Sequence, residues 1–375
     1  MKYVKWVVYA VAGIIFGLIL IFKASNAVDD RLDPDAEAVL KEQIPVTEQG
    51  TKAFYYLLGL RAGDEKNPEA TGRDLWNRGE AVPEKEEAVF FKDKFKDRWT
   101  SLPFSQHRNE SDREQWKRKE VQDAFAKVGP QVQQYIKLLE YGEIAPLHTR
   151  DLYTAAQIPP TMLLKGSKWM HVYLGKLVTE KKWSEAERLV RLEANFQRSF
   201  WQYQPMLHMM VGTVIVQSDA RFLNDEKKLE PKLKVTPQTV AALKMPETKV
   251  LFHDALKSEF RHFAAAMPMI LNHAADDWLP EGSPEILRRM SMRRALLPNE
   301  TINKYYQFTK EADEKICDDC YPSIQWAHPK YPWQWLRNPM GHWMMSIFTV
   351  QLQHRFEALQ LKQKEIEDVR NRLSA

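Results

Sequence analysis

The sequence predicts an all-α fold, in which an N-terminal transmembrane helix is followed by an irregular multi-helix domain. The 375 residues include only 14 glycines against 21 prolines, and low glycine content disfavours a sheet with many tight turns. No segment shows the strict alternation of apolar and polar residues that is typical of a half-buried strand. With 44% hydrophobic and 28% charged residues, the composition is that of a folded body rather than a disordered chain.

The N-terminal segment carries the strongest signal in the chain. Lys2 and Lys5 precede a run without charged residues, residues 6–22, which Lys23 closes before an acidic stretch at 29–37. A run of roughly 17 residues is at the short end for a membrane-spanning helix and longer than the apolar part of a usual signal peptide. Because lysines precede the run and acids follow it, we expect residues 6–22 to cross the membrane with the N-terminus inside.

A cleaved signal peptide is the alternative. Ser25-Asn26-Ala27 is a small-x-small triplet, so cleavage is then expected after Ala27. Both alternatives export the chain from about residue 28 onward. The compact chain has only two Asn-x-Ser/Thr triplets, at Asn109 and Asn299, which favours a bacterial source. We therefore predict a single-pass protein of the bacterial inner membrane with a cytoplasmic N-terminus and a periplasmic body, or a periplasmic protein if it is cleaved.

Three regions are expected along the chain. The transmembrane anchor or signal segment is residues 1–27, an N-terminal helical and irregular region follows at 28–120, and a helical bundle domain spans 121–375. Between 61 and 118 the sequence is charged, poor in aliphatic residues and dotted with aromatic residues, which predicts an irregular or partly helical excursion. Apolar residues resume helical spacing at 121–141.

Capping residues and prolines predict where helices begin. Asp33-Pro34 places an N-cap before a proline at the first helical position, and this helix should stop near Pro45. Ser184 and Glu187 form a capping-box pattern. Further helix starts are expected at Thr47, Thr236-Pro237, Pro246-Glu247, Ser283-Pro284 and Asn299, with a last long helix at 342–373.

Cys317 and Cys320 are the two cysteines of the chain. In an oxidising compartment, two cysteines at this spacing are expected to form a disulfide. A redox-active pair needs a lowered thiol pKa, which the acidic Asp318 and Asp319 between the cysteines oppose. A zinc site would need further ligands, such as His328. The structural disulfide is therefore the preferred interpretation.

A metal site on a predicted helix is a further hypothesis. Glu259 and His262 have the Glu-x-x-His spacing that places both side chains on one helix face, as in di-iron bundles. His273 follows on the same predicted helix and near the same face. Such sites need a second Glu-x-x-His pair, which we do not find, so a polar helix face is the preferred interpretation. No cofactor is expected.

Several classes of function lack support in the sequence. The chain has neither a G-x-G-x-x-G nor a G-x-x-x-x-G-K-[ST] motif for nucleotide phosphates, and no G-x-S-x-G nucleophile elbow. Its net charge of +4 gives no footprint of nucleic-acid binding. Nucleic acid is therefore not an expected partner, and no catalytic residue is assigned.

An aromatic stretch is the best candidate for a ligand or partner surface. Within a short proline-rich segment lie Trp326, Tyr331, Trp333, Trp335 and Trp343. Rigid aromatic surfaces of this kind suit sugars, extended peptides or a membrane interface. Arg289 and Arg293 belong to a basic amphipathic helix at 286–297 that suits lipid headgroups or an acidic partner. The alternatives are a connection held in the core by its own tryptophans and a solvated helix face.

Two parts of the sequence resemble a known group of proteins. FYYLLGLRAG at Phe54–Gly63 and NPEATGR at Asn67–Arg73 resemble the start of a group of membrane-anchored envelope proteins of Proteobacteria. RNPMGHW at Arg337–Trp343 resembles the Asn-Pro-x-Gly that precedes their last helix. The resemblance would span most of the exported chain, and it implies an anchor with a periplasmic body. The group carries no activity to transfer.

The expected function is that of a non-enzymatic, single-pass envelope protein. Its exported helical domain is expected to bind another envelope component, as an assembly factor, a chaperone or an immunity-type partner. One alternative is an envelope hydrolase or a lipid- or glycan-modifying enzyme. The other is a periplasmic binder of a metal or small ligand that uses Glu259, His262 and His273.

Overall fold

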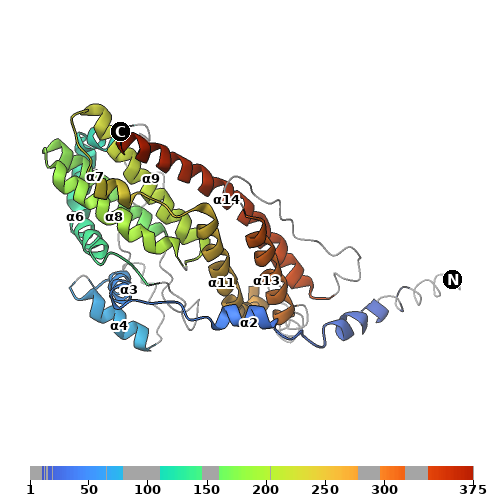
Figure 1. Ribbon diagram of the computed structural model, residues 1–375. Coiled ribbons are helices and arrows are strands. Elements are labelled where there is room, and N and C mark those ends of the chain that lie inside the picture. Colours follow the sequence, from blue (N-terminus) through green and yellow to red (C-terminus); the bar gives the residue numbers. More distant parts are fainter. Residues whose placement is uncertain are drawn as a thin grey trace, which may run out of the picture. The chain divides into compact units, whose positions relative to one another are not determined.

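The computed structural model describes residues 11–78, 110–145, 160–277, 296–316 and 337–374, apart from positions 12, 14, 15, 19, 65 and 203. Every regular element assigned within these ranges is a helix (Figure 1). The all-α prediction is therefore confirmed for the described residues, and they contain no strand.

The predicted membrane span is described only in part. Residues 6–10, 12, 14, 15 and 19 of the uncharged run lie outside the described residues, whereas residues 20–25 are helical. Within the described part of the chain, no helix is both long enough and apolar enough to cross a membrane. The transmembrane helix stays a prediction.

The chain forms two compact units, and each is discontinuous in sequence. Unit 1 consists of residues 1–43 and 259–356, and unit 2 consists of residues 44–258 and 357–375. The division predicted from the sequence instead follows the order of the chain. Two long helices, α11 (Thr248–Asp277) and α14 (Pro339–Ser374), contribute residues to both units.

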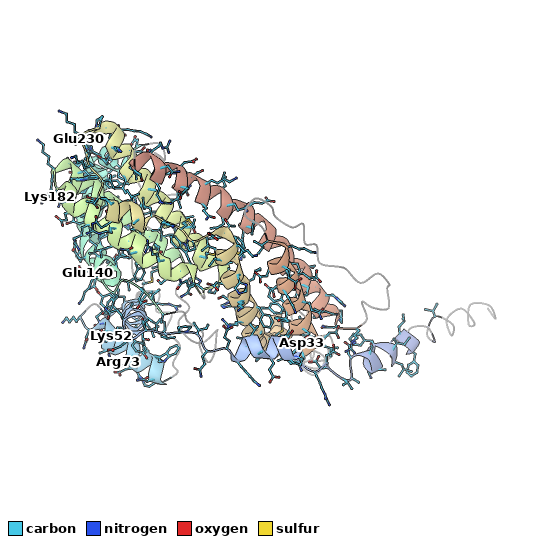
Figure 2. All side chains as sticks on the ribbon, in the orientation of Figure 1. Asp33, Lys52, Arg73, Glu140, Lys182 and Glu230 are labelled. Carbon is cyan, nitrogen blue, oxygen red and sulfur yellow. The ribbon has the colours of Figure 1, made fainter. Side chains whose placement is uncertain are left out.

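Unit 1 contains α2 (Pro34–Lys41), α13 (Pro298–Lys315) and the adjoining parts of α11 and α14. Helix α2 begins as predicted, because a carboxylate oxygen of Asp33 accepts hydrogen bonds from the backbone N–H groups of Asp35 and Ala36 (Figure 2). The proline at the first helical position has no N–H that needs a partner. The local sequence therefore specifies where this helix starts.

The start of α13 corrects a prediction. Asn299 was expected to cap this helix, but the helix begins at Pro298, and Leu297 stands at the N-cap without a side-chain bond. The carboxylate of Asp29 instead accepts hydrogen bonds from the backbone N–H groups of Asn299 and Glu300, at 2.8 and 3.1 Å. The cap therefore comes from a distant part of the chain, which no local pattern reveals.

The segment that follows the predicted span is bonded to the start of α14. Arg337 donates from Nη1 to the carbonyl oxygen of Ser25 at 2.6 Å and from Nη2 to Asp30 at 2.8 Å. The backbone N–H of Asn338 donates to the side-chain oxygen of Asn26 at 2.8 Å. Asn338 is fully buried with a left-handed φ of 55°, a conformation in which asparagine is enriched. We call these five residues the N-terminal clamp.

Unit 2 contains most of the helices. In chain order they are α3 (Glu48–Arg61), α4 (Pro68–Arg78), α5 (Asp112–Trp116), α6 (Lys119–Leu139), α7 (Pro160–Thr179), α8 (Trp183–Gln197), the 3₁₀ helix η1 (Arg198–Trp201), α9 (Met206–Leu229) and α10 (Pro237–Ala242). Helix α3 begins one residue after its predicted start at Thr47, because Thr47 is the N-cap and its hydroxyl accepts from the N–H of Gly50 at 2.9 Å. Helices α4 and α5 are helical parts of the stretch predicted to be irregular or partly helical.

Helices α3 and α4 touch backbone to backbone at two glycines. A Cβ added at Gly59 would lie 1.8 Å from the carbonyl oxygen of Pro68, and one added at Gly72 would lie 1.9 Å from that of Tyr55. Any side chain at these positions would force the two helices apart. This contact gives a physical reason for glycine at both positions.

Helices α6 to α9 build the core of unit 2. Apolar residues recur at helical spacing on each helix, and on α6 they include Val121, Val128 and Leu139, all buried. Helix α7 packs on both α8 and α9, and α8 packs on α9 (Figure 1). The α7–α8 turn at Lys182 and the end of α9 at Glu230 lie at the same end of the unit (Figure 2).

The capping box predicted at Ser184 and Glu187 is wrong. Helix α8 begins at Trp183, with Lys182 at the N-cap and no side-chain cap bond. Glu187 instead accepts hydrogen bonds from the backbone N–H and the hydroxyl of Thr236, at 2.6 and 2.7 Å. Glu187 is buried, so it bonds the tertiary partner that reaches it there rather than the exposed end of its own helix.

Candidate metal centre

A cluster of ionisable side chains lies in the core of unit 2. His171 comes from α7, Glu193 from α8 and Asp219 from α9, and one ligand-type atom of each lies within 4.8 Å of the other two. Glu193 and Asp219 are completely buried, and His171 is 8% exposed. We call these three residues the acid–histidine cluster. Among the described residues, it is the group that brings three such donors to metal-ligand spacing.

His171 is oriented by Asp112, the first residue of α5. Its Nδ1 lies 2.7 Å from Oδ2 of Asp112, and this bond directs Nε2 toward the acids. Nε2 lies 3.3 Å from Oδ1 of Asp219 and 4.0 Å from Oε2 of Glu193. The ring of Phe222 contacts the imidazole edge-on, with the ring centroids 6.0 Å apart. The imidazole is therefore held from two sides with one nitrogen facing both carboxylates.

Glu193 is held by two hydroxyl groups. Tyr135 on α6 donates to Oε1 at 2.6 Å, and Ser167 on α7 donates to Oε2 at 3.3 Å. The ring of Tyr135 packs directly against Gly166, where an added Cβ would lie 2.5 Å from a ring carbon of the tyrosine. Both hydroxyl-bearing residues are buried, so two neighbouring helices fix the position of this carboxylate.

Asp219 is the least satisfied member of the cluster. Oδ2 of Asp219 has no hydrogen-bond partner in the described part of the chain, and Oδ1 forms only the 3.3 Å ion pair with Nε2 of His171. A buried polar atom without a partner costs about 1–3 kcal/mol, and more when it is charged. Unsatisfied atoms that converge on one point therefore mark a place where a bound ligand would restore the lost interactions.

The pKa values of the cluster are shifted by burial and by mutual charge. Burial opposes the positive charge of His171, but the carboxylates of Asp112 and Asp219 outweigh this effect and hold the pKa of the imidazole well above its ordinary value. Burial raises the pKa of Glu193 well above its ordinary value, and the nearby Asp219 adds to the rise. Burial also raises the pKa of Asp219, which His171 partly offsets.

The donor set suits a divalent metal ion. Imidazole nitrogen and carboxylate oxygen are ligands of Zn²⁺, and of other first-row divalent metals. Ligands about 2.0–2.2 Å from one ion lie up to about 4 Å apart, which is close to the spacings in the cluster. Asp112 bonds the far nitrogen of His171, and a carboxylate in this place usually orients a histidine ligand. Facing helices of a bundle are a common source of such ligand sets.

Most of the residues that the sequence analysis singled out lie outside the described ranges. These are Cys317, Cys320, Trp326, Tyr331, Trp333, Trp335, Arg289 and Arg293. Trp343 is described, lies near the start of α14 and is 41% exposed. The disulfide and the aromatic and basic partner surfaces therefore stay predictions.

The predicted metal site on α11 gains no further ligand from the described residues. Glu259 and His262 both lie on α11 and are half-buried, but they belong to no group of three donors at metal-ligand spacing there. The side chain of His273 lies outside the described residues. This site also stays a prediction.

The sequence analysis missed the acid–histidine cluster, although a signal was present. Glu193 lies on the buried stripe of α8 with Leu189 and Phe196, and Asp219 lies on the buried stripe of α9 with Val216. Acids are rarely buried unless they are paired. A charged residue on the apolar stripe of successive helices is the pattern that reveals such a cluster.

No protein-family model, no curated protein and no solved structure matches the chain, so the chemistry of the acid–histidine cluster itself carries the functional assignment.

Proposed function

We propose that unit 2 binds a divalent metal ion through His171, Glu193 and Asp219. The observation that carries the proposal is the convergence of one imidazole nitrogen and two carboxylates on one buried point. Nε2 of His171 and Oδ1 of Asp219 form only an ion pair with each other, at 3.3 Å, and Oδ2 of Asp219 has no hydrogen-bond partner among the described residues. A metal ion is a ligand that uses all of these atoms at once.

A cation also balances the charge of the site. Asp112, Glu193 and Asp219 bring three carboxyl groups around the single imidazole of His171. An uncompensated buried charge costs several kcal/mol, so either protonation of an acid or a bound cation has to remove the excess. A divalent ion removes it while coordinating these atoms, in competition with the protons that the raised pKa values of His171 and Glu193 favour.

Titration of the full-length protein with metal tests this proposal. The detergent-solubilised chain is stripped with EDTA, dialysed, and titrated with Co²⁺, Zn²⁺ and Mn²⁺ by calorimetry, with the visible absorption of Co²⁺ as a second readout. We expect one ion per chain and a higher melting temperature in the metal-loaded protein, because a ligand that binds the native state stabilises it. Absence of binding of all three ions up to about 1 mM, a free energy of about −4 kcal/mol, would falsify the proposal.

We also propose that the chain is a single-pass inner-membrane protein whose helical body lies in the periplasm and binds another envelope component. The uncharged run at residues 6–22 and the lysines before it support the membrane span and its orientation. The N-terminal clamp favours a retained anchor, because cleavage after Ala27 would remove Ser25 and Asn26 from it. Asn26 is 6% exposed, so its loss would leave the backbone N–H of Asn338 without its partner.

Mass spectrometry of the native protein tests retention of the anchor. We expect the chain purified from membranes to keep residues 1–27, and Ala27→Leu to change its mass by the substitution alone. Ala27 is exposed, so leucine fits the structure, whereas a signal peptidase requires a small residue at the cleavage site. A native chain that begins at Val28, with processing blocked in Ala27→Leu, would show that the segment is a cleaved signal.

Crosslinking of the full chain in its own membranes tests the envelope partner. A reproducibly crosslinked envelope component supports the binding function. Failure to crosslink any component, together with turnover of envelope lipids or glycans by the purified chain, would replace it with the enzymatic alternative.

A further inference from the structure

We infer that α5 is a movable cover through which the metal ion enters and leaves the acid–histidine cluster; this inference rests on the metal-binding function proposed above. The side chains of Glu193 and Asp219 are 0% exposed, whereas those of His171 and Asp112 are 10% and 19% exposed. Exposure thus rises from the acids to the residue that α5 contributes. Asp112 is the most exposed of these four side chains, so solvent comes nearest to the cluster on the side of α5.

Helix α5 lies close along α7, but its own residues are attached at the surface of unit 2 rather than in its core. None of the five residues of α5 is buried. Arg113 donates to Glu226 at 2.5 Å and lies 3.7 Å from Glu230, and Trp116 packs edge-on against Phe125 with ring centroids 5.5 Å apart. A short helix without buried residues has low local stability, because few apolar contacts oppose its opening. Movement of α5 therefore exposes no buried residue of its own, whereas movement of α7, α8 or α9 would expose the apolar core.

The closed position of α5 depends on Gly175, one turn after His171 on α7. A Cβ at this position would lie 2.2 Å from the carbonyl oxygen of Asp112 and 2.6 Å from its carbonyl carbon. These are backbone atoms of α5, so a side chain at position 175 is accommodated by moving α5 away from α7. Such a movement withdraws the carboxylate of Asp112 from Nδ1 of His171, which frees the imidazole to turn and admit an ion to the acids behind it. Gly175 therefore links the position of the cover to the orientation of the imidazole.

Release of Co²⁺ from the Gly175→Ala variant tests the inference. The full-length protein is loaded with Co²⁺ and mixed with excess EDTA, and loss of the Co²⁺ absorption is followed by stopped flow. We expect release about tenfold faster than in the wild type, because one added methyl at a close contact strongly favours the open position. Uptake of Co²⁺ should accelerate as well, so that the dissociation constant changes less than either rate.

Gly129→Ala is the matched control. Gly129 also lies inside a helix, α6, but an added Cβ would meet nothing closer than a ring carbon of Phe125 at 3.9 Å. Alanine favours helix over glycine at both positions, so the two variants differ in the contact with α5. Release from Gly129→Ala should match the wild type.

A second variant tests the cover from the other side of α5. Arg113→Gln removes the ion pair with the buried Glu226 and leaves α7 untouched, so faster release of Co²⁺ is expected. Its control is Arg188→Gln, which removes an exposed pair whose guanidinium lies 4.0 Å from Glu140. If Gly175→Ala and Arg113→Gln bind Co²⁺ and release it at the wild-type rate, the cover is refuted while the metal site stands. A wild type that binds no Co²⁺ refutes the proposed function itself.

Discussion

The full-length Asp219→Asn variant is expected to bind Co²⁺ about a hundredfold or more weakly than the wild type, since even outer-shell partners of a metal site contribute about ten- to hundredfold. Asparagine keeps the size of aspartate but replaces the carboxylate by a neutral amide. Both oxygens of Asp219 lie in the cluster without other hydrogen-bond partners among the described residues. The loss is measured by calorimetric titration and by the visible absorption of bound Co²⁺.

Asp225→Asn is the matched control for this substitution. Asp225 lies on the same helix, α9, but it is 45% exposed and pairs with Lys228 at 3.1 Å. The Asp225→Asn variant should bind Co²⁺ with the same affinity as the wild type. Unchanged affinity in Asp219→Asn would exclude Asp219 as a ligand, and equal weakening in both variants would indicate a general effect of charge rather than a site.

The second large effect is expected in the metal-free protein. His171→Ala should lower the free energy of unfolding by about 3–5 kcal/mol, the usual cost of removing one partner of a buried ion pair. The imidazole lies between two carboxylates, 2.7 Å from Asp112 and 3.3 Å from Asp219. Alanine leaves Asp219 buried without this cation and creates a cavity beside Phe222. Urea unfolding of the EDTA-treated full chain in mild detergent, followed by circular dichroism, measures the change.

Glu193→Gln is the comparison that separates an ion-pair effect from a packing effect. The amide oxygen can replace Oε1, which accepts from Tyr135, and the amide NH2 can donate to the hydroxyl of Ser167 in place of the bond to Oε2. The substitution also removes a buried carboxylate next to Asp219. We expect the metal-free variant to unfold within about 1 kcal/mol of the wild type, the size of a typical net hydrogen-bond contribution. Losses of similar size in His171→Ala and Glu193→Gln would contradict the role of His171 as the compensating cation.

The sequence by itself determined the helical fold class and several helix starts. Asp33 caps α2 as predicted, and α3 starts within one residue of its predicted start at Thr47, because an N-cap bond closes between residues two or three positions apart. The apolar spacing at 121–141 located α6 within two residues at each end, because one buried helix face imposes its period on the sequence. These features depend on neighbours along the chain, and a single sequence contains them.

Tertiary structure decided the features whose partners lie far apart in the sequence. Asp29 caps α13 although it lies 270 positions away in the sequence. The backbone N–H of Thr236 donates to the carboxylate of Glu187, which lies 49 positions away. In both cases the local pattern predicted a different capping residue, Asn299 for α13 and Ser184 for α8. The actual bond depends on which segment packs against the helix end.

The acid–histidine cluster belongs to this second class. His171, Glu193 and Asp219 are ionisable residues on largely apolar buried helix faces, and each helix alone predicts only an amphipathic stripe. The three become a candidate metal centre because α7, α8 and α9 pack on one another and exclude water. That packing follows from apolar burial over whole helices, which is non-directional. The local sequence therefore specified the stripes, and the packed bundle alone brought the three charged groups to one point.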